Sequence, residues 1–315
     1  VLEVCANLDV IATDAPIISS TNLTNTFNSC TSLTGGCDNW DVSNATTLKS
    51  MFSGCSNFNG DITNWDVGNV TRMENAFRNC SNFNQPIGKW DVSSVRQFSQ
   101  MLNGCTNFNQ DLGNWNIENV TTFSTLFKST SNLNASFVEN WNVTNACTNL
   151  NEMLRGVGII GTTDINHWDV SNVTTFRGCF RDTDFNGDIT GWNVSGIDFR
   201  SMFNNNSSFN QDIGSWDMSS ATNISTMLRN TPFDQDISGW DITNVTDMTN
   251  FMHANTAFST ANYDALLVAW EAQTPQSNIS VSFGDAQYTS GSSAETARTS
   301  LINTYNWTIS DGGAV

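Results

Sequence analysis

The chain has few charged residues, and few of these are basic. Charged residues make up 13% of the 315 residues, and 12 Lys and Arg stand against 30 Asp and Glu, which gives a formal net charge of −18. Nucleic-acid binding needs a basic surface, so this balance argues against a nucleic-acid partner. The same excess of acid argues against docking on an anionic membrane.

Long apolar runs and metal-binding cysteine pairs are missing as well. No stretch approaches the roughly 20 apolar residues that a membrane-spanning helix needs, so we expect no membrane insertion. The sequence begins at Val1 and carries no visible signal peptide. We therefore expect a processed or excerpted chain from which any export signal has been removed. The eight cysteines include no Cys-x-x-Cys pair, which disfavours a zinc ribbon.

Catalytic constellations are absent from the sequence. The two histidines, His167 and His253, lie in different repeats without matching partners, and no Gly-rich phosphate loop is present. We therefore expect no catalytic residues, no cofactor and no enzymatic activity. A glycan-active enzyme, the third hypothesis, would require an isolated carboxylate cluster in a cleft.

Tryptophan, in contrast, is abundant and periodic. Nine of the 11 tryptophans recur at intervals of 24 to 27 residues. A period of this size indicates stacked supersecondary units. The nine are Trp40, Trp65, Trp90, Trp115, Trp141, Trp168, Trp192, Trp216 and Trp240.

The apolar positions within one repeat suggest its local structure. Trp65 and Val67 lie two residues apart, so both face one side of a predicted short strand. Val70, Met73 and Phe77 then step by three and four residues, which is helical or 3₁₀ spacing. Each repeat can bury its apolar face only against its neighbours. The pattern predicts a leucine-rich-repeat-like, right-handed α/β solenoid with a parallel sheet of short strands and about nine turns.

The two ends of the chain depart from the period. We expect an N-terminal cap and partial repeat at 1–33, the Trp-repeat solenoid at 34–260, and a small α/β C-terminal cap at 261–315. In that cap the pattern predicts helices at 262–272 and 293–304 and strands at 279–283 and 307–309. The period also breaks at 134–140 and 156–163, where we most expect a site that the other repeats lack.

The repeat resembles that of a known family. The run from Met51 to Asn59, followed by Trp65-Asp66-Val67, is similar to the repeat of BspA-like leucine-rich-repeat surface proteins, of the mycoplasma-lipoprotein or PARCEL type. The resemblance covers about residues 20 to 313. It implies a secreted or surface-anchored protein that acts in adhesion or partner binding, and it supplies no catalytic residues. The chain departs from many leucine-rich repeats at Val70 and Val95, where those repeats place an asparagine ladder.

These observations leave two main hypotheses of function. The first is an extracellular or cell-surface protein whose repeated face mediates adhesion, with a protein or a glycan on another surface as its partner. The alternative is a structural subunit of an extracellular filament, sheath or surface layer, assembled by self-association through head-to-tail contacts.

The cysteines have two interpretations that the sequence leaves open. One position in four consecutive repeats holds Cys30, Cys55, Cys80 and Cys105, either as disulfide staples between repeats or as small buried side chains. A further disulfide in the N-terminal cap would join Cys5 to Cys37 or to Cys30.

Acidic residues and sequons recur with the same period. Oxygen-rich rows suit calcium, although a solvated polar face is the main interpretation. The calcium candidates are Asp66, Asp91, Asp188, Asp212 and Asp236. Sequons of the form Asn-x-Ser/Thr predict N-glycosylation at surface turns if the source adds such glycans. The candidate acceptors are Asn22, Asn44, Asn69, Asn119, Asn172, Asn244 and Asn278.

Overall fold

A computed structural model describes residues 5–10 and 18–315 of the chain. It divides into two compact units, Val1–Ile160 and Gly161–Val315. The division falls inside the predicted break of the period at 156–163. Part of the predicted N-terminal cap, residues 1–4 and 11–17, lies outside the described residues.

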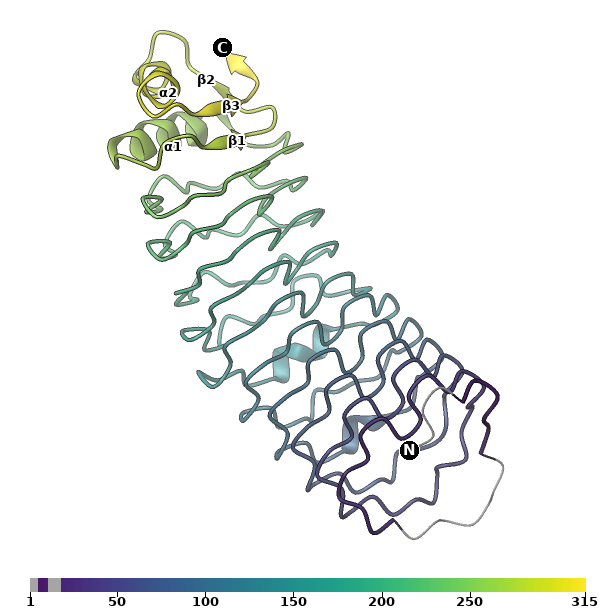
Figure 1. The fold of residues 1–315 in the computed structure, drawn as a ribbon. Coiled ribbons are helices and arrows are strands. Elements are labelled where there is room, and N and C mark those ends of the chain that lie inside the picture. The colour runs from purple at the N-terminus through teal and green to yellow at the C-terminus, as the bar shows by residue number, and fades with distance from the viewer. Residues whose placement is uncertain (1–4, 11–17) are drawn as a thin grey trace. The chain divides into compact units, whose positions relative to one another are not determined.

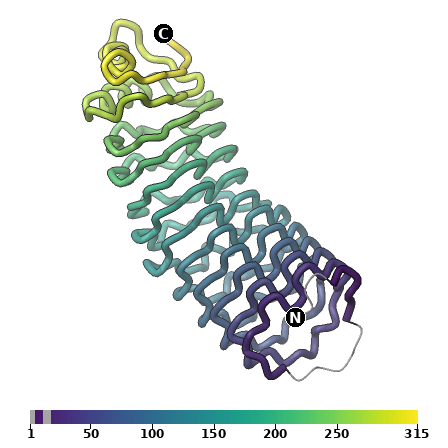
Figure 2. The backbone as a smooth tube through the Cα atoms, in the orientation of Figure 1, coloured from purple at the N-terminus to yellow at the C-terminus, as the bar shows by residue number. Residues whose placement is uncertain are grey.

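The first unit is a stack of coils joined by parallel backbone bridges (Figures 1 and 2). Each bridge joins equivalent residues of neighbouring coils. The bridged residues, in order, are Asn22, Thr47, Arg72, Gln97, Thr122 and Asn149. Each coil thereby covers the apolar face of the next, as the repeat pattern requires.

The predicted helical segment of each repeat is wrong. In the second coil, Asn75 and Asn79 have φ angles of 58° and 59°, which a right-handed helix does not allow. The backbone N–H groups of Met73, Asn75, Phe77 and Asn79 donate to carbonyls of the next coil at 2.8 to 3.2 Å. The spacing of three and four residues between apolar side chains therefore arises here from consecutive turns and not from a helix. We call this side of the first unit, formed by 46–54, 71–79, 96–104, 121–129 and 148–156, the turn-ladder side.

The predicted strand at Trp65 and Val67 is also misplaced, because the bridge of this coil lies at Arg72. The tryptophans contribute to stacking in a different way. The indole Nε1 of Trp65 donates to the carbonyl of Cys37 at 3.0 Å, and that of Trp90 donates to the carbonyl of Ile62 at 3.2 Å. The buried indoles of Trp65 and Trp90 thus satisfy their polar atom on the preceding coil, which favours Trp at this position.

Phenylalanine rings fill the interior of the same unit. Phe52 stacks on Phe77 with ring centroids 5.5 Å apart, and Phe83 stacks on Phe108 at 5.9 Å. All four rings are buried. The core is therefore a set of ring columns that run from coil to coil.

Two short 3₁₀ helices interrupt the coils of the first unit: η1 (Ile87–Lys89) and η2 (Ser136–Asn140). η2 lies in the coil whose predicted irregularity is 134–140. It begins after Ala135 and ends before Trp141, and it buries Phe137 and Val138.

The second unit has bridged coils and then the regular elements at the C-terminus. Its bridges join Thr175, Asp198, Asn223 and Asp247 in order. The elements that follow are α1 (Thr260–Ala272), β1 (Ser280–Ser282), β2 (Gln287–Tyr288), α2 (Ser293–Asn303), β3 (Thr308–Ser310) and β4 (Gly313–Ala314). β1 pairs with β3 and β2 pairs with β4, both in parallel.

The helices and strands predicted for 261–315 are therefore confirmed as α1, β1, α2 and β3. A bridge from Met248 to Val281 joins β1 to the last coil, so these elements cover the coil's open edge. None of the helices formed by the described residues is long and apolar enough to span a membrane.

Candidate functional site

An asparagine ladder runs along the first unit, at a different position from that of leucine-rich repeats. The backbone N–H of Asn84 donates to Oδ1 of Asn59, that of Asn109 to Asn84, and that of Asn134 to Asn109, each at 2.9 Å. These residues follow the buried Phe or Leu of each coil. The side-chain amide oxygen of each Asn thus accepts a hydrogen bond from a backbone N–H of the next coil, which would otherwise be unpaired.

The ladder changes at the coil that contains η2. Oδ1 of Asn134 accepts from the N–H of Ser136 in its own coil, at 3.1 Å, and thereby starts the 3₁₀ turn. The N–H of Ala135 donates to the carbonyl of Ile159 at 2.8 Å. The segment from Asn134 to Trp141 is one residue longer than the equivalent segment from Asn109 to Trp115, and a pocket lies between these two coils.

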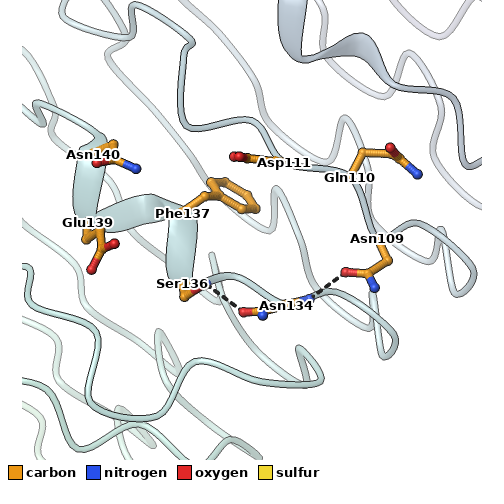
Figure 3. Close-up of a pocket in the computed structure, with 8 residues that line it drawn as sticks. All are labelled: Asn109, Gln110, Asp111, Asn134, Ser136, Phe137, Glu139 and Asn140. Atoms are coloured by element: carbon orange, nitrogen blue, oxygen red, sulfur yellow. Dashed lines mark hydrogen bonds between the residues drawn. The ribbon is translucent and has the colours of Figure 1, made fainter.

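This pocket, which we call the η2 pocket, has a volume of about 360 Å³ and is lined by two neighbouring coils (Figure 3). Its lining residues are Asn109, Gln110, Asp111, Asn134, Ser136, Phe137, Glu139 and Asn140. The side chains of Asp111 and Asn140 point toward one another beside the ring of Phe137 (Figure 3). Six of the eight side chains are amides or carboxylates, and none is basic.

Gly113 forms the place where these groups meet. A β-carbon added there would stand 3.0 Å from Nδ2 of Asn140, 3.1 Å from Oδ1 of Asp111 and 3.5 Å from Cβ of Phe137. Oδ1 of Asp111 already accepts from the N–H of Gly113 at 2.8 Å, which fixes the carboxylate. A side chain at Gly113 would therefore crowd Asn140 and Asp111, two of the residues that line the pocket.

The chemistry of the pocket suits a neutral or cationic ligand with several hydroxyl groups. Amide groups both donate and accept, and a carboxylate accepts from hydroxyls or amines. A ring edge such as that of Phe137 offers an apolar surface beside them. An anionic ligand would find two carboxylates, Asp111 and Glu139, and no cation.

The calcium candidates instead serve local turns. Oδ1 of Asp188 accepts from the N–H of Thr190 at 2.9 Å, and Asp212 and Asp236 make the same contact with Gly214 and Ser238 at 3.0 and 2.9 Å. In such an Asx turn, the Asp side chain accepts a hydrogen bond from the backbone N–H two residues later, and this local role explains why Asp occurs at these positions.

Asp66 and Asp91, two further calcium candidates, both lie close to Gly68. A β-carbon at Gly68 would stand 3.4 Å from an oxygen of Asp66 and 3.6 Å from one of Asp91. Hydrogen bonds from Ser93 hold the pKa of Asp91 below its usual value. In the part of the chain that the structure describes, no three His, Cys, Asp or Glu side chains are grouped to hold a metal ion.

All seven candidate glycosylation asparagines are exposed. Nδ2 of Asn69, Asn119 and Asn244 donates to a serine carbonyl of the preceding coil at 2.8 to 3.0 Å. The threonine hydroxyls of the same triplets also donate to the preceding coil, as Thr71 does to Thr46 at 3.3 Å. The Asn-Val-Thr triplet thus has a structural role, and N-glycosylation stays a prediction.

Four of the cysteines, Cys30, Cys55, Cys80 and Cys105, lie in a buried column. The thiol of Cys55 donates to the carbonyl of Phe27, Cys80 to Phe52 and Cys105 to Phe77, each at 2.9 Å. Thr130 continues the column with a hydroxyl that donates to Leu102 at 2.9 Å. The sequence contains a signal for this column that our sequence analysis missed. Cys5 precedes Cys30 by 25 residues, and Thr130 follows Cys105 by the same period.

We expect these thiols to pack as small donors and not to form staples. Among the described residues, which include all eight cysteines, no disulfide bond is present. Burial raises the pKa of Cys37, Cys55 and Cys147 to about 12 in each case. Thiol labelling of these buried cysteines should therefore be slow in the native protein, because the thiolate is the reactive form.

Intact mass after labelling in denaturant, with and without reductant, checks this expectation. We expect eight labels in both cases. Two labels fewer for each bond, restored by reductant, would instead establish the staples or the Cys5 disulfide.

Comparison with known proteins gives one match. No curated protein and no solved structure matches the chain significantly. Membership of the BspA-like or leucine-rich-repeat proteins therefore stays a prediction. A family described as "Mycoplasma protein of unknown function, DUF285" matches residues 21–141 and 148–265. Because these ranges cover well over half of the sequence, the chain belongs to the DUF285 family.

Proposed function

We propose that the protein is an extracellular or cell-surface repeat solenoid that binds a glycan on another surface through the η2 pocket. The carrying observation is the pocket itself. It lies at the one coil of the first unit that contains a five-residue 3₁₀ helix, and amides and carboxylates dominate its lining.

The hydrogen-bonding capacity of the pocket supports a sugar as ligand. Oδ1 of Asn109 and Nε2 of Gln110 are already bonded, to Asn134 N at 2.9 Å and to Asn84 Oδ1 at 2.8 Å. The amide of Asn140 has no bonded partner among the described residues, and neither does the carboxylate of Glu139. These groups can bond sugar hydroxyls without breaking the ladder, so binding would not cost folding free energy.

The pocket contains both hydrogen-bond acceptors and a hydrogen-bond donor, and this combination favours a sugar over a simple cation. Asp111 and Glu139 supply carboxylate oxygens, but the neighbouring amide nitrogen of Asn140 is a donor that a cation would repel. A ring hydroxyl, in contrast, can accept from Asn140 and donate to Asp111 at once. The side chains of Asp111 and Asn140 point toward one another, which fits this pairing (Figure 3).

A screen of the full chain on an array of neutral oligosaccharides tests the proposal. The wild-type protein should bind a subset of glycans, and Asn140→Ala should weaken that binding by about tenfold, as expected when one or two net hydrogen bonds of about 1 kcal/mol each are lost. Asn64→Ala is the matched control, because Asn64 also precedes the Trp of its coil, is exposed and does not line the pocket.

The proposal fails if the wild-type protein binds no glycan on the array. It fails equally if Asn140→Ala and Asn64→Ala bind as tightly as each other. Retained unfolding temperature in both variants shows that any loss of binding is local.

A further inference from the structure

The charged residues of the first unit are sorted by side of the coil. The turn-ladder side carries six of its basic residues, which are Lys49, Arg72, Arg78, Arg96, Lys128 and Arg155. Two carboxylates, Glu74 and Glu152, lie on the same side. Six positive and two negative charges leave an excess of four positive charges on this side.

The side that contains the Trp-Asp segments has the opposite charge. We call it the Asp side, and define it by 36–43, 61–68, 86–93, 111–118 and 136–144. It carries eight carboxylates and one cation, Lys89. The carboxylates are Asp38, Asp41, Asp61, Asp66, Asp91, Asp111, Glu118 and Glu139. The turn at Gly68 and Asn69 separates this side from the turn-ladder side in the second coil.

Part of the positive charge is uncompensated. Arg72 pairs with Glu74 at 2.6 Å, and Lys128 and Arg155 share Glu152 at 2.5 and 2.6 Å. Arg78 and Arg96 are exposed, and no carboxylate of the described residues pairs with them. These two guanidinium groups, in neighbouring coils, are therefore available to a partner.

The acidic row repeats with the coils, whereas the basic residues do not, because the positions equivalent to Arg72 and Arg96 in the neighbouring coil hold Gln97 and Thr71. Asp41, Asp66 and Asp91 occupy one position in three successive coils, and each is exposed. Stacked backbone segments in parallel pairing lie about 4.8 Å apart, so the carboxylates of the acidic row follow this axial spacing. Every copy of the chain thus carries an acidic surface whose charge is complementary to that of the turn-ladder side of another copy.

We infer that the protein associates side by side with a second copy of itself, with the turn-ladder side of one copy on the Asp side of the next. The two contact surfaces differ, so the contact does not close on itself and can propagate into an open array. This inference does not rest on glycan binding at the η2 pocket.

Salt should affect such a contact in two directions. The net charge of −18 repels copies at long range when little salt is present. At physiological ionic strength the Debye length is about 8 Å, which screens the net charge more than it screens pairs in contact. Association should therefore be strongest near about 0.15 M salt, the concentration to which that screening length belongs. The affinity between copies should fall at about 1 M salt.

Sedimentation velocity of the full chain at about 0.02, 0.15 and 1 M NaCl tests the inference, because these salt concentrations span the relevant screening lengths. Wild-type protein should form dimers and larger species at the middle concentration. Arg96→Glu should weaken association by about tenfold or more, since a charge at a complementary contact is reversed. Lys89→Glu is the matched control, because it makes the same change of net charge on the Asp side.

A charge swap separates a lost contact from a misfolded variant. Asp66→Arg combined with Asp91→Arg should also abolish self-association, and mixing this variant with Arg78→Glu/Arg96→Glu should restore a mixed complex. A wild-type chain that stays monomeric at every salt concentration overturns the inference. So does equal weakening by Arg96→Glu and Lys89→Glu, or a monomer that instead binds heparin through Arg78 and Arg96.

Discussion

Replacing Trp115 with alanine is expected to lower the free energy of unfolding of the first unit by about 3 to 5 kcal/mol. The side chain of Trp115 is 3% exposed and stacks on Phe98 with ring centroids 5.3 Å apart. Its Nε1 donates to the carbonyl of Ile87 at 3.1 Å. The substitution therefore leaves a cavity and an unpaired carbonyl at the same place. Urea unfolding followed by circular dichroism measures the loss.

Trp115→Phe separates the two contributions. It keeps most of the ring and removes the indole donor, so we expect a loss of about 1 to 3 kcal/mol, mainly from the carbonyl of Ile87. A loss below about 1 kcal/mol for Trp115→Ala would contradict the burial and stacking of this ring, since truncating a buried aromatic residue costs several times more.

Replacing Asp311 with alanine is expected to destabilise the second unit by about 3 to 5 kcal/mol, because it leaves a largely buried cation unpaired. The side chain of Asp311 is 3% exposed and that of Arg298 is 19% exposed. Asp311 accepts from Nε of Arg298 and from the hydroxyl of Tyr263, both at 2.7 Å. Burial and the charge of Asp311 together raise the pKa of Tyr263, which keeps this hydroxyl a donor.

Asp285→Ala provides the control for this substitution. Asp285 lies in the same C-terminal region but is exposed, so its loss should change the free energy of unfolding by no more than about 0.5 kcal/mol. Thermal unfolding of both variants, followed by the near-ultraviolet signal, makes the comparison. Similar small shifts for Asp311→Ala and Asp285→Ala would show that the Arg298–Asp311 pair contributes little.

The sequence predicted the period and the buried residues well, because these depend on the recurrence of large apolar side chains. Trp65 and Phe77 are both buried. It failed on local conformation, because the residues that set it have small polar side chains. Asn75 and Asn79 stand at positions with positive φ, and other coils place Gly54 or Gly104 at the position of Asn79. These glycines and asparagines signalled a left-handed conformation that an apolar pattern does not record.

The candidate site could be located from the sequence but not described. The break of the period at 134–140 pointed to the coil of the η2 pocket. The side chains that line the pocket opposite η2, such as Gln110 and Asp111, come from a coil of ordinary length and carry no singular signal. Their role depends on Gly113 and on the direction of Asn140, which only the spatial arrangement provides.

Calorimetric titration of the strongest array glycan into Gly113→Ala is the most direct test of the η2 pocket as the binding site. The new methyl group would occupy the space 3.0 to 3.1 Å from Asn140 Nδ2 and Asp111 Oδ1, while the backbone of Gly113 needs no positive φ. We predict that the side chains of Asn140 and Asp111 shift, that the fold is retained, and that the affinity for the glycan falls at least about tenfold, which corresponds to about 1.4 kcal/mol. Wild-type affinity in Gly113→Ala would contradict the proposal and place the binding surface elsewhere on the coils.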